Sequence, residues 1–387
     1  MKQYELISKV LAPMLLLLNS CTILVSTESQ TATSTIETNN SPETAVTQSS
    51  EVPRITMLHE WVLPAQNIKD IKWSPAGEHL VILTEEHVTL YDTSTFEEMW
   101  RIESIAPAYY ASAATFSSDG KTLTLYTRLT GLQRRDTRSG MLLAEKPEYN
   151  NPANCFPSEA VDAVFSSDIN NMFVSINRED SQQQSDIHSE IHAWNVQNLE
   201  CTSVFGRIEG NARSVDLSFD GKYLALGVGL NTSTSGNDIK EDGQIAVRNL
   251  ESGQLVCSIG HQGSFARFKP GNSVLLVANP AKNQLVYWNV ETCDMVGELT
   301  GITTRYDFAF SPDGRMLALL DNDNDISIID PSSGTVLQTI NDPTSDNVLP
   351  MNRLFGFLSF SPDGKYLIYA VRKEPFESMI FIWAIER

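Results

Sequence analysis

One short sequence pattern recurs along most of the chain and restricts its possible folds more than any other feature. An apolar segment ending in an aromatic residue or leucine is followed by a turn similar to Ser-Pro-Asp-Gly and a second apolar segment. The seven copies begin at Trp73, Phe116, Phe165, Leu217, Phe268, Phe310 and Phe360. Their starts lie 43, 49, 52, 51, 42 and 50 residues apart. Periods of this length are typical of folds built from repeated supersecondary units around one continuous core.

The chemistry of the recurring turn predicts two antiparallel strands in every copy. In the copy that begins at Phe310, FSPDGRMLALL, the Ser and Asp side chains accept backbone hydrogen bonds and Pro presets φ. The Gly supplies the left-handed conformation that closes a bulged hairpin. The flanking segments, such as 317–320 and 224–226, are apolar without interruption, which suits inner strands buried on both faces.

A third strand in each copy ends in a pair such as Tyr91-Asp92, Trp194-Asn195 or Trp288-Asn289, and a fourth follows a short turn. This four-strand unit resembles the WD40-repeat β-propeller family, and the turn also resembles the repeats of TolB-like propellers. The resemblance covers residues 54–387, although the intact Trp-Asp pair is absent and only Gly260-His261 matches the Gly-His half of the signature. It implies an all-β fold: a seven-bladed β-propeller of four-stranded antiparallel blades.

The two ends of the repeat region predict how such a ring closes. The sequence stops at Arg387, after the third strand of the seventh copy, so that copy has no fourth strand of its own. Residues 55–61, upstream of the first copy, fit an outer strand with no blade of its own. We therefore expect this N-terminal strand to complete the last blade, because unpaired edges would otherwise remain.

The N-terminus carries the features of an export signal. Lys2 and Lys9 precede an apolar run at 10–18, which is too short to span a bilayer and is typical of a signal-peptide core. The following Leu18-Asn19-Ser20-Cys21 resembles the lipobox of bacterial lipoproteins. The resemblance implies that residues 1–20 are removed, that Cys21 is lipidated, and that the protein crosses the inner membrane and faces the periplasm or the exterior. An ordinary cleaved signal with an incidental Cys is the alternative.

Between the signal and the repeats, residues 26–53 are rich in Ser and Thr and contain no Lys, Arg or aromatic residue. Such a segment has too little apolar surface to offset the entropy lost on ordering. We therefore expect three parts: the lipoprotein-type signal at 1–20, a flexible tether at 21–53 and the propeller at 54–387.

The charge of the chain excludes one class of partner. Lys and Arg total 28 against 48 for Asp and Glu, a formal net charge of −20 that repels phosphate backbones. No nucleic acid partner is expected. No nucleophile elbow, HExxH helix or paired catalytic Cys and His motif is present, so we expect no enzyme activity and no cofactor.

Two long loops are the best candidates for a binding surface. They follow the second strand of the third and fourth copies, at 177–190 and 229–243, and both are polar and acidic. Variable loops on a rigid scaffold often carry binding residues, although insertions without function are equally familiar. The candidate partner-binding residues are Glu179, Asp180, Asp186, Glu190, Asp238, Glu241 and Asp242.

Two clusters raise the question of a metal. Asp321, Asp323 and Asp325 alternate with Asn and could hold Ca²⁺ weakly, but the same residues favour a tight turn and lack the Gly and Glu of a calcium loop. His188 and His192 on the predicted third strand of the third copy would lie about 13 Å apart, too far to share a zinc ion. We expect them to be solvated residues near a strand edge.

The cysteines leave the pairing open. Cys155, Cys201, Cys257 and Cys293 allow three connectivities in an oxidising compartment, and free buried thiols are the default expectation. The sequence as a whole predicts an envelope propeller that binds an unidentified protein and meets the membrane only through its N-terminal lipid. The alternative is a binder of a small ligand, metal or sugar, or an enzyme, that uses the central channel.

Overall fold

The computed structural model describes most of the repeat region. The described residues are 53–64, 67–103, 111–127, 131–146, 160–166, 170–179, 187–229, 243–262, 265–279, 282–302, 307–321, 325–341, 356–373 and 377–386. Cys21, Cys155 and the signal and tether segments lie outside them. No helix of the described residues has the length and apolar character needed to cross a membrane.

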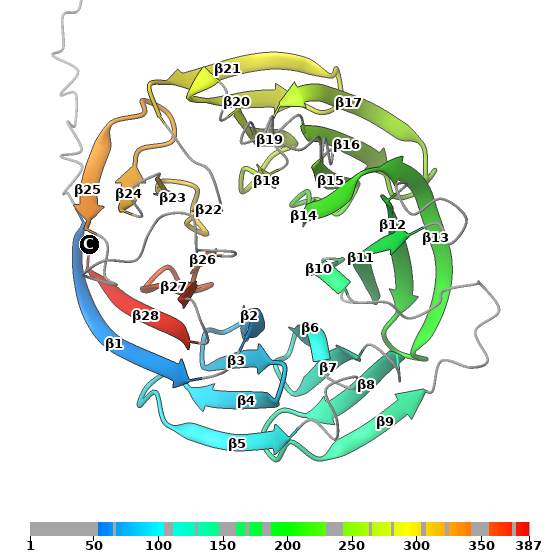
Figure 1. Ribbon diagram of the computed structural model, residues 1–387, viewed down its shortest axis with the longest axis vertical. Helices are drawn as coiled ribbons and strands as arrows, with labels where there is room; N and C mark the ends of the chain where they lie inside the picture. The colour runs from blue at the N-terminus through cyan, green and yellow to red at the C-terminus, as the bar shows by residue number, and fades with distance from the viewer. Residues whose placement is uncertain are drawn as a thin grey trace, which may run out of the picture. The chain divides into compact units, whose positions relative to one another are not determined.

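Seven four-stranded antiparallel sheets stand around a central axis, as the sequence predicts (Figure 1). Blade 1 contains β2 (Ile68–Trp73), β3 (His79–Thr84), β4 (His87–Asp92) and β5 (Glu98–Glu103). Blade 2 contains β6 (Ala111–Phe116), β7 (Thr122–Thr127), β8 (Gly131–Asp136) and β9 (Leu142–Lys146). Blade 3 contains β10 (Ala160–Phe165), β11 (Asn171–Glu179), β12 (Ile187–Asn195) and β13 (Glu200–Glu209). Blade 4 contains β14 (Asn211–Leu217), β15 (Tyr223–Gly229), β16 (Gly243–Asn249) and β17 (Leu255–Gln262).

The remaining blades repeat this order from the axis outward. Blade 5 contains β18 (Ala266–Phe268), β19 (Val274–Asn279), β20 (Gln284–Asn289) and β21 (Asp294–Thr300). Blade 6 contains β22 (Phe308–Phe310), β23 (Leu317–Leu320), β24 (Ile326–Ile329) and β25 (Val336–Ile340). Blade 7 contains β26 (Gly356–Phe360), β27 (Tyr366–Lys373), β28 (Glu377–Glu386) and, as its outer strand, β1 (Arg54–Pro64).

The predicted closure of the ring is confirmed. β1 pairs antiparallel with β28, from Arg54 opposite Glu386 to Pro64 opposite Glu377. On the inward side of this strand, Trp61 and Leu63 pack against the buried core between blades 7 and 1. The first and last strands of the propeller therefore share one sheet, and β28 is paired on both sides instead of forming an unpaired outer edge.

The turns between first and second strands form the hairpins that the sequence pattern predicts. In blade 6, Ser311 Oγ accepts the N–H of Met316 at 2.9 Å and donates to Asp313 at 2.6 Å. The same two bonds recur around Ser361 of blade 7. Gly314 closes its turn at a φ of +67°, a conformation that suits glycine.

The hydrophobic core lies between successive blades rather than at the axis. The cluster between blades 1 and 2 contains Leu83 and Leu90 from one blade and Phe116 and Leu125 from the next. Similar clusters fill the other seams. Burying each such side chain contributes about 1.5–3 kcal/mol, so a blade gains most of its stability from its two neighbours.

A second turn, between the third and fourth strands, links each blade to the one before it. Its fifth residue has a positive φ in six blades, at Phe96, Gly140, Leu199, Gly253, Cys293 and Gly334. Where this residue is Gly140, the indole of Trp100 from the preceding blade fills the space in which a Cβ would stand. Where it carries a side chain, as at Phe96 and Leu199, that side chain is buried in the seam.

Candidate functional site

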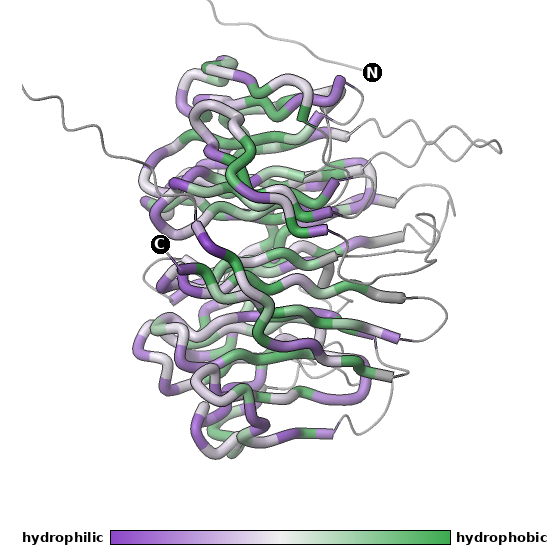
Figure 2. Tube along the Cα trace, turned by 90° about the vertical axis from the view of Figure 1, so that its left-hand side faces the viewer, coloured by the Kyte–Doolittle hydropathy of each residue, from purple (hydrophilic) through white to green (hydrophobic). Residues whose placement is uncertain are grey.

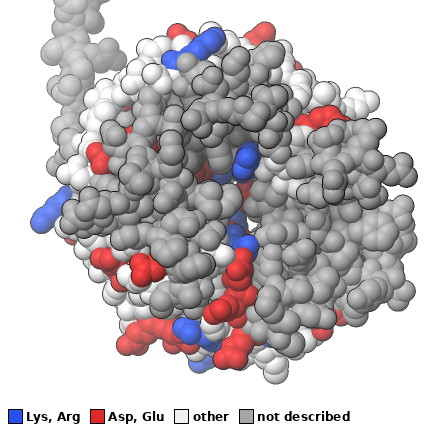
Figure 3. All heavy atoms as spheres, viewed as in Figure 1, with Lys and Arg blue, Asp and Glu red and all other residues white. Residues whose placement is uncertain are grey.

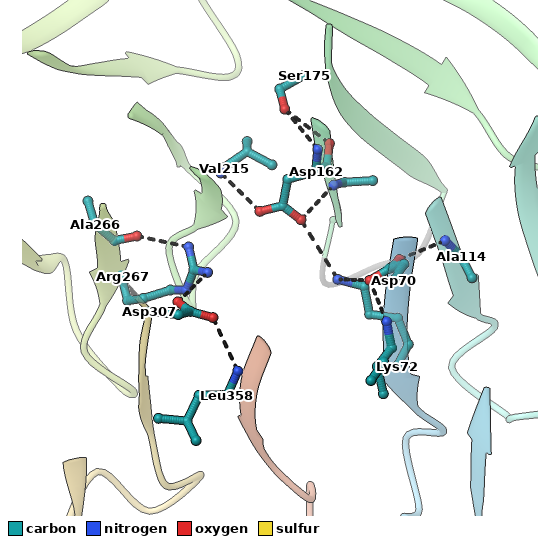
Figure 4. Close-up of polar contacts among 12 residues, drawn as sticks. Asp70, Lys72, Ala114, Asp162, Ser175, Val215, Ala266, Arg267, Asp307 and Leu358 are labelled. Atoms are coloured by element: carbon teal, nitrogen blue, oxygen red, sulfur yellow. Dashed lines mark hydrogen bonds and ion pairs between the residues drawn. The ribbon is translucent and has the colours of Figure 1, made fainter. Parts of the chain in front are cut away.

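Six charged side chains gather around the central channel of the propeller, and the sequence analysis did not single them out. Asp70 and Lys72 lie on β2, Asp162 on β10, Asp216 on β14 and Arg267 on β18, while Asp307 immediately precedes β22. Figure 4 shows most of this group converging from inner strands of different blades. Figure 3 shows cationic and acidic atoms at the central opening of the disc.

Three of the carboxylates each fasten one blade to the next through a backbone hydrogen bond. Asp70 accepts the N–H of Ala114 in blade 2 at 2.9 Å, and Asp162 accepts the N–H of Val215 in blade 4 at 3.1 Å (Figure 4). Asp216 accepts the N–H of Phe268 in blade 5 at 2.6 Å. Hydrogen bonds to ionised acceptors are stronger than neutral ones, so these bonds hold the inner strands in register.

Two cations connect further blades across the channel. The guanidinium of Arg267 lies 3.0 Å from a carboxylate oxygen of Asp307. The ammonium of Lys72 lies 3.4 Å from Asp70 and 3.9 Å from Asp162. Both cations keep roughly a quarter to a third of their side chains accessible, at 24 % for Arg267 and 32 % for Lys72.

Burial and neighbouring charges shift the pKa values of Asp70, Lys72, Asp216 and Asp307 away from their ordinary values. Burial raises the pKa of Asp216 to about 6, although Arg267 and backbone N–H groups partly oppose the shift. Burial also raises the pKa values of Asp70 and Asp307 against the opposing effects of Lys72 and Arg267. Burial alone would lower the pKa of Lys72, but Asp70 and Asp162 reverse this and raise it.

The arrangement acts first as a brace. Each channel carboxylate described above accepts a backbone hydrogen bond from a neighbouring blade or contacts a cation, which offsets the cost of burying its charge. Within the described ranges, no three His, Cys, Asp or Glu side chains are placed to hold a metal ion. The partly accessible cations and the carboxylates of the channel are groups that can recognise a charged ligand.

These residues stand at matching positions of the repeats, although they belong to no known motif. Asp70, Asp162 and Asp307 each stand four residues before the Ser of their turn. Lys72 and Asp216 stand two residues before the corresponding Ser. Charged residues at matching positions of otherwise apolar inner strands identify a shared site, but only after the repeats are aligned on the turn.

The prediction that His188 and His192 are solvated was wrong. Both are buried on β12, and their Nε2 atoms lie 3.3 and 3.2 Å from the two carboxylate oxygens of Glu190 between them. β12 is an interior strand that begins at Ile187, so alternate residues share one covered face. The histidines are part of the packed interior of blade 3.

The acidic loop residues fall into two groups. Glu190 lies inside β12 and Glu179 ends β11, so these strands extend further into the predicted loop than the sequence analysis placed them. The other candidates, Asp180, Asp186, Asp238, Glu241 and Asp242, lie outside the described residues. Their role in partner binding stays a prediction.

The possible calcium cluster is described only at its two ends. The carboxylate of Asp321 accepts the N–H of Asp325 at 3.0 Å, which is the bond of a tight turn between β23 and β24. Asp323 lies outside the described residues. The weak Ca²⁺ site at Asp321, Asp323 and Asp325 stays a prediction.

The expectation of free thiols was wrong. Cys257 on β17 of blade 4 forms a disulfide with Cys293 in the turn that precedes β21 of blade 5. Cys201 on β13 is also disulfide-bonded. Free thiols were expected because the sequence does not show which outer strand lies beside which turn. That contact exists only in the assembled ring.

No protein-family model matches this chain, and no curated protein matches its sequence. The seven-bladed ring is consistent with the resemblance to WD40-type propellers at the level of fold. What the fold and site define is a β-propeller whose channel is braced by charge.

Proposed function

We propose that this protein is a secreted, lipid-anchored β-propeller of the cell envelope that acts as a protein-binding scaffold. The Cys257–Cys293 disulfide is the observation that carries the envelope assignment. Disulfides persist in oxidising compartments and are rare in the cytosol. An export signal with a lipobox-like Cys21 at the N-terminus agrees with the same destination.

The binding role rests on how the charges are distributed. The described channel carboxylates bond to strands of the same ring, and this supports a structural task for the centre. The long acidic loops predicted in blades 3 and 4 are then the best candidates for partner binding. With a net charge of −20, the partner that suits them is a protein with a basic surface.

Affinity capture tests the binding role. The mature protein is crosslinked in native membranes and compared with a deletion of residues 230–242 and with a variant in which Asp238, Glu241 and Asp242 become Asn and Gln. We expect both variants to lose the same basic partner, and the wild-type capture to weaken at high salt because the attraction is electrostatic. Unchanged captured proteins would remove the role of these loops.

The anchor has its own test. Mass spectrometry of the protein from its native membrane should find acyl chains on Cys21 as the first residue, and Cys21→Ser should release the protein from the membrane fraction. More than one acyl chain is needed for durable attachment, so the mass also predicts the strength of anchoring. An unmodified Cys21 would overturn the lipoprotein assignment.

One observation favours a second candidate, a small cationic ligand in the channel. Among the described residues, four carboxylates and two cations line it, and Asp216 has a pKa of about 6 because its burial is incompletely compensated. A titratable carboxylate beside an opening is a typical feature of a binding site. Arginine and spermidine titrations of the wild type and of Asp216→Asn decide it: binding that the substitution removes supports the channel site, and no heat of binding excludes it.

A further inference from the structure

The outer strands of the propeller share an irregularity that the hydrogen-bond register makes visible. Near the start of every outer strand, one residue is skipped in the pairing with the third strand. The skipped residues are Leu58, Met99, Leu143, Thr202, Val256, Val296 and Leu337. Each is a β-bulge at the same level of its blade.

The bulge turns apolar side chains outward. The exposed residues at or beside it are Met57, Leu58, Met99, Met141, Leu142, Leu143, Leu255, Val256, Met295, Val296 and Val336, which we call the apolar rim. They belong to every blade except blade 3, where Cys201 and Thr202 occupy the place. Their exposed fractions run from 38 % to 61 %, so each retains a large part of its side chain in solvent.

The rim is confined to one end of the outer strands. Further along the same strands most exposed residues are polar, as at Glu103, Glu145, Glu298 and Thr339, and the apolar exceptions, Val62 and Val204, stand singly. A bulge can protect an edge strand from pairing by twisting the edge away, but this task does not require exposed apolar side chains at the bulge. Apolar residues at one level of six blades point instead to a surface that becomes covered.

The occupant is indicated by where the N-terminal segment enters. Arg54, the first residue of β1, lies opposite Glu386 at the rim end of the strand, only three residues before Met57. The chain that precedes β1 is therefore connected to the propeller at the rim end of this strand. In the edge-on view, the short turns and the C-terminal label lie on the same side of the disc (Figure 2).

We propose that the apolar rim rests on the lipid bilayer to which the chain is anchored, with the short-turn face toward the membrane. This rests on the proposed lipid anchor and extends it from the tether to the body of the propeller. A flat bilayer meets every sector of such a rim at once, whereas a protein partner covers one sector. Because the adjoining turns carry acids such as Asp92, Asp136 and Asp330, the preferred surface is zwitterionic rather than anionic lipid.

Methionine oxidation measures this contact directly, because a covered thioether reacts slowly with peroxide. The full chain, produced without acylation, is coupled through Cys21 to a maleimide lipid in phosphatidylcholine vesicles. We expect Met57, Met99, Met141 and Met295 to oxidise at least about fivefold more slowly than in the uncoupled chain. Met172 and Met316, which are buried in the propeller, serve as internal references and should not change.

Two further arms fix the interpretation. Vesicles containing phosphatidylglycerol should protect the four methionines less than phosphatidylcholine vesicles do. The variant Met141→Glu with Leu143→Glu should reduce protection at Met57 and Met99. This variant should melt at the same temperature as the wild type. Equal oxidation rates in the coupled and uncoupled chains would overturn the proposal. Protection in the native envelope but not on pure lipid would also overturn it, in favour of a protein partner.

The assay separates the two hypotheses. Chemical coupling supplies the anchor, so a chain that is never acylated in the cell fails the proposed function without affecting the vesicle result. A chain that is acylated but shows no methionine protection fails the rim proposal alone.

Discussion

The disulfide between blades 4 and 5 offers a quantitative test of how the ring is stabilised. Cys257 and Cys293 are 36 residues apart, so their bond closes a loop of that length in the unfolded chain. The loss of loop-closure entropy on such a crosslink corresponds to about 4 kcal/mol at 25 °C. We therefore expect the double variant Cys257→Ala with Cys293→Ala to be less stable by about that amount.

The corresponding change in melting temperature follows from the size of the domain. The entropy of unfolding is about 2.1 cal/mol/K per residue, hence about 0.7 kcal/mol/K for the roughly 330 residues of the propeller. A loss of about 4 kcal/mol lowers the melting temperature by about 5–6 °C. Scanning calorimetry or circular dichroism on the two proteins measures it.

Reductant provides the control for lost packing at Cys257, which is almost fully buried. When the wild type is reduced, it loses the same crosslink, so the gap between the two proteins should shrink to about 1–2 °C, the amount set by the removed sulfur atoms. A gap that stays the same with and without reductant would show that packing, not the crosslink, holds this seam. Equal melting in both conditions would refute the reasoning altogether.

Three further perturbations probe the closure, a seam and the channel. Deleting residues 54–61 should abolish cooperative melting because β28 loses its outer partner, whereas deleting 26–50 should leave the melting curve intact; equal curves would refute the closure. Gly140→Ala should cost about 1 kcal/mol more in unfolding free energy than Gly120→Ala, since both have a positive φ but only the first Cβ meets Trp100, at 2.9 Å; denaturant melts compare them. Asp216 binds its proton more tightly in the folded state, where its pKa is about 6, than in the unfolded state, where it is 3.8. The free energy of unfolding of the wild type, relative to that of Asp216→Asn, should therefore fall by up to about 3 kcal/mol as the pH rises from 4 to 7. A difference between those two proteins that is flat across this range in urea titrations would mean that Asp216 is not shifted.

The sequence was sufficient for the architecture because each repeat is marked by local chemistry. A Ser, an Asp and a Gly at fixed positions define a hairpin wherever they occur, as around Ser311 and Ser361. An outer strand at 55–61 was also predictable, since a four-strand unit that lacks one strand requires a donor from elsewhere, and the observed strand runs from Arg54 to Pro64. Both inferences require only local sequence motifs and the number of strands in each repeat.

What the sequence could not supply are the contacts that exist only between blades. Cys257 meets Cys293 because an outer strand of one blade lies against a turn of the next, and no spacing in the sequence records this. His188 is buried because the strand it occupies begins earlier than the pattern indicated. The channel groups were missed because many of their partners lie in other repeats. Asp162, for example, contacts Val215 and Lys72 from other blades.

Those contacts form a connected series when they are followed around the channel. Asp70 links blade 1 to blade 2, and Lys72 links blade 1 to Asp162 of blade 3. Asp162 and Asp216 then join blades 3, 4 and 5 through backbone N–H groups. Arg267 joins blade 5 to Asp307 of blade 6, whose carboxylate reaches Leu358 of blade 7 at 3.4 Å.

Every blade is thus tied to at least one other by a charged side chain, and the circle is completed at the outside, where β1 belongs to blade 7 but packs on blade 1. The charged contacts and the apolar seams contribute differently to the assembly of the ring. Apolar seams are non-directional and would tolerate sliding of one blade against another, whereas a carboxylate that must meet one backbone N–H fixes a single register. The charges at the axis therefore specify how the blades align, and the apolar seams supply most of the free energy that keeps them together.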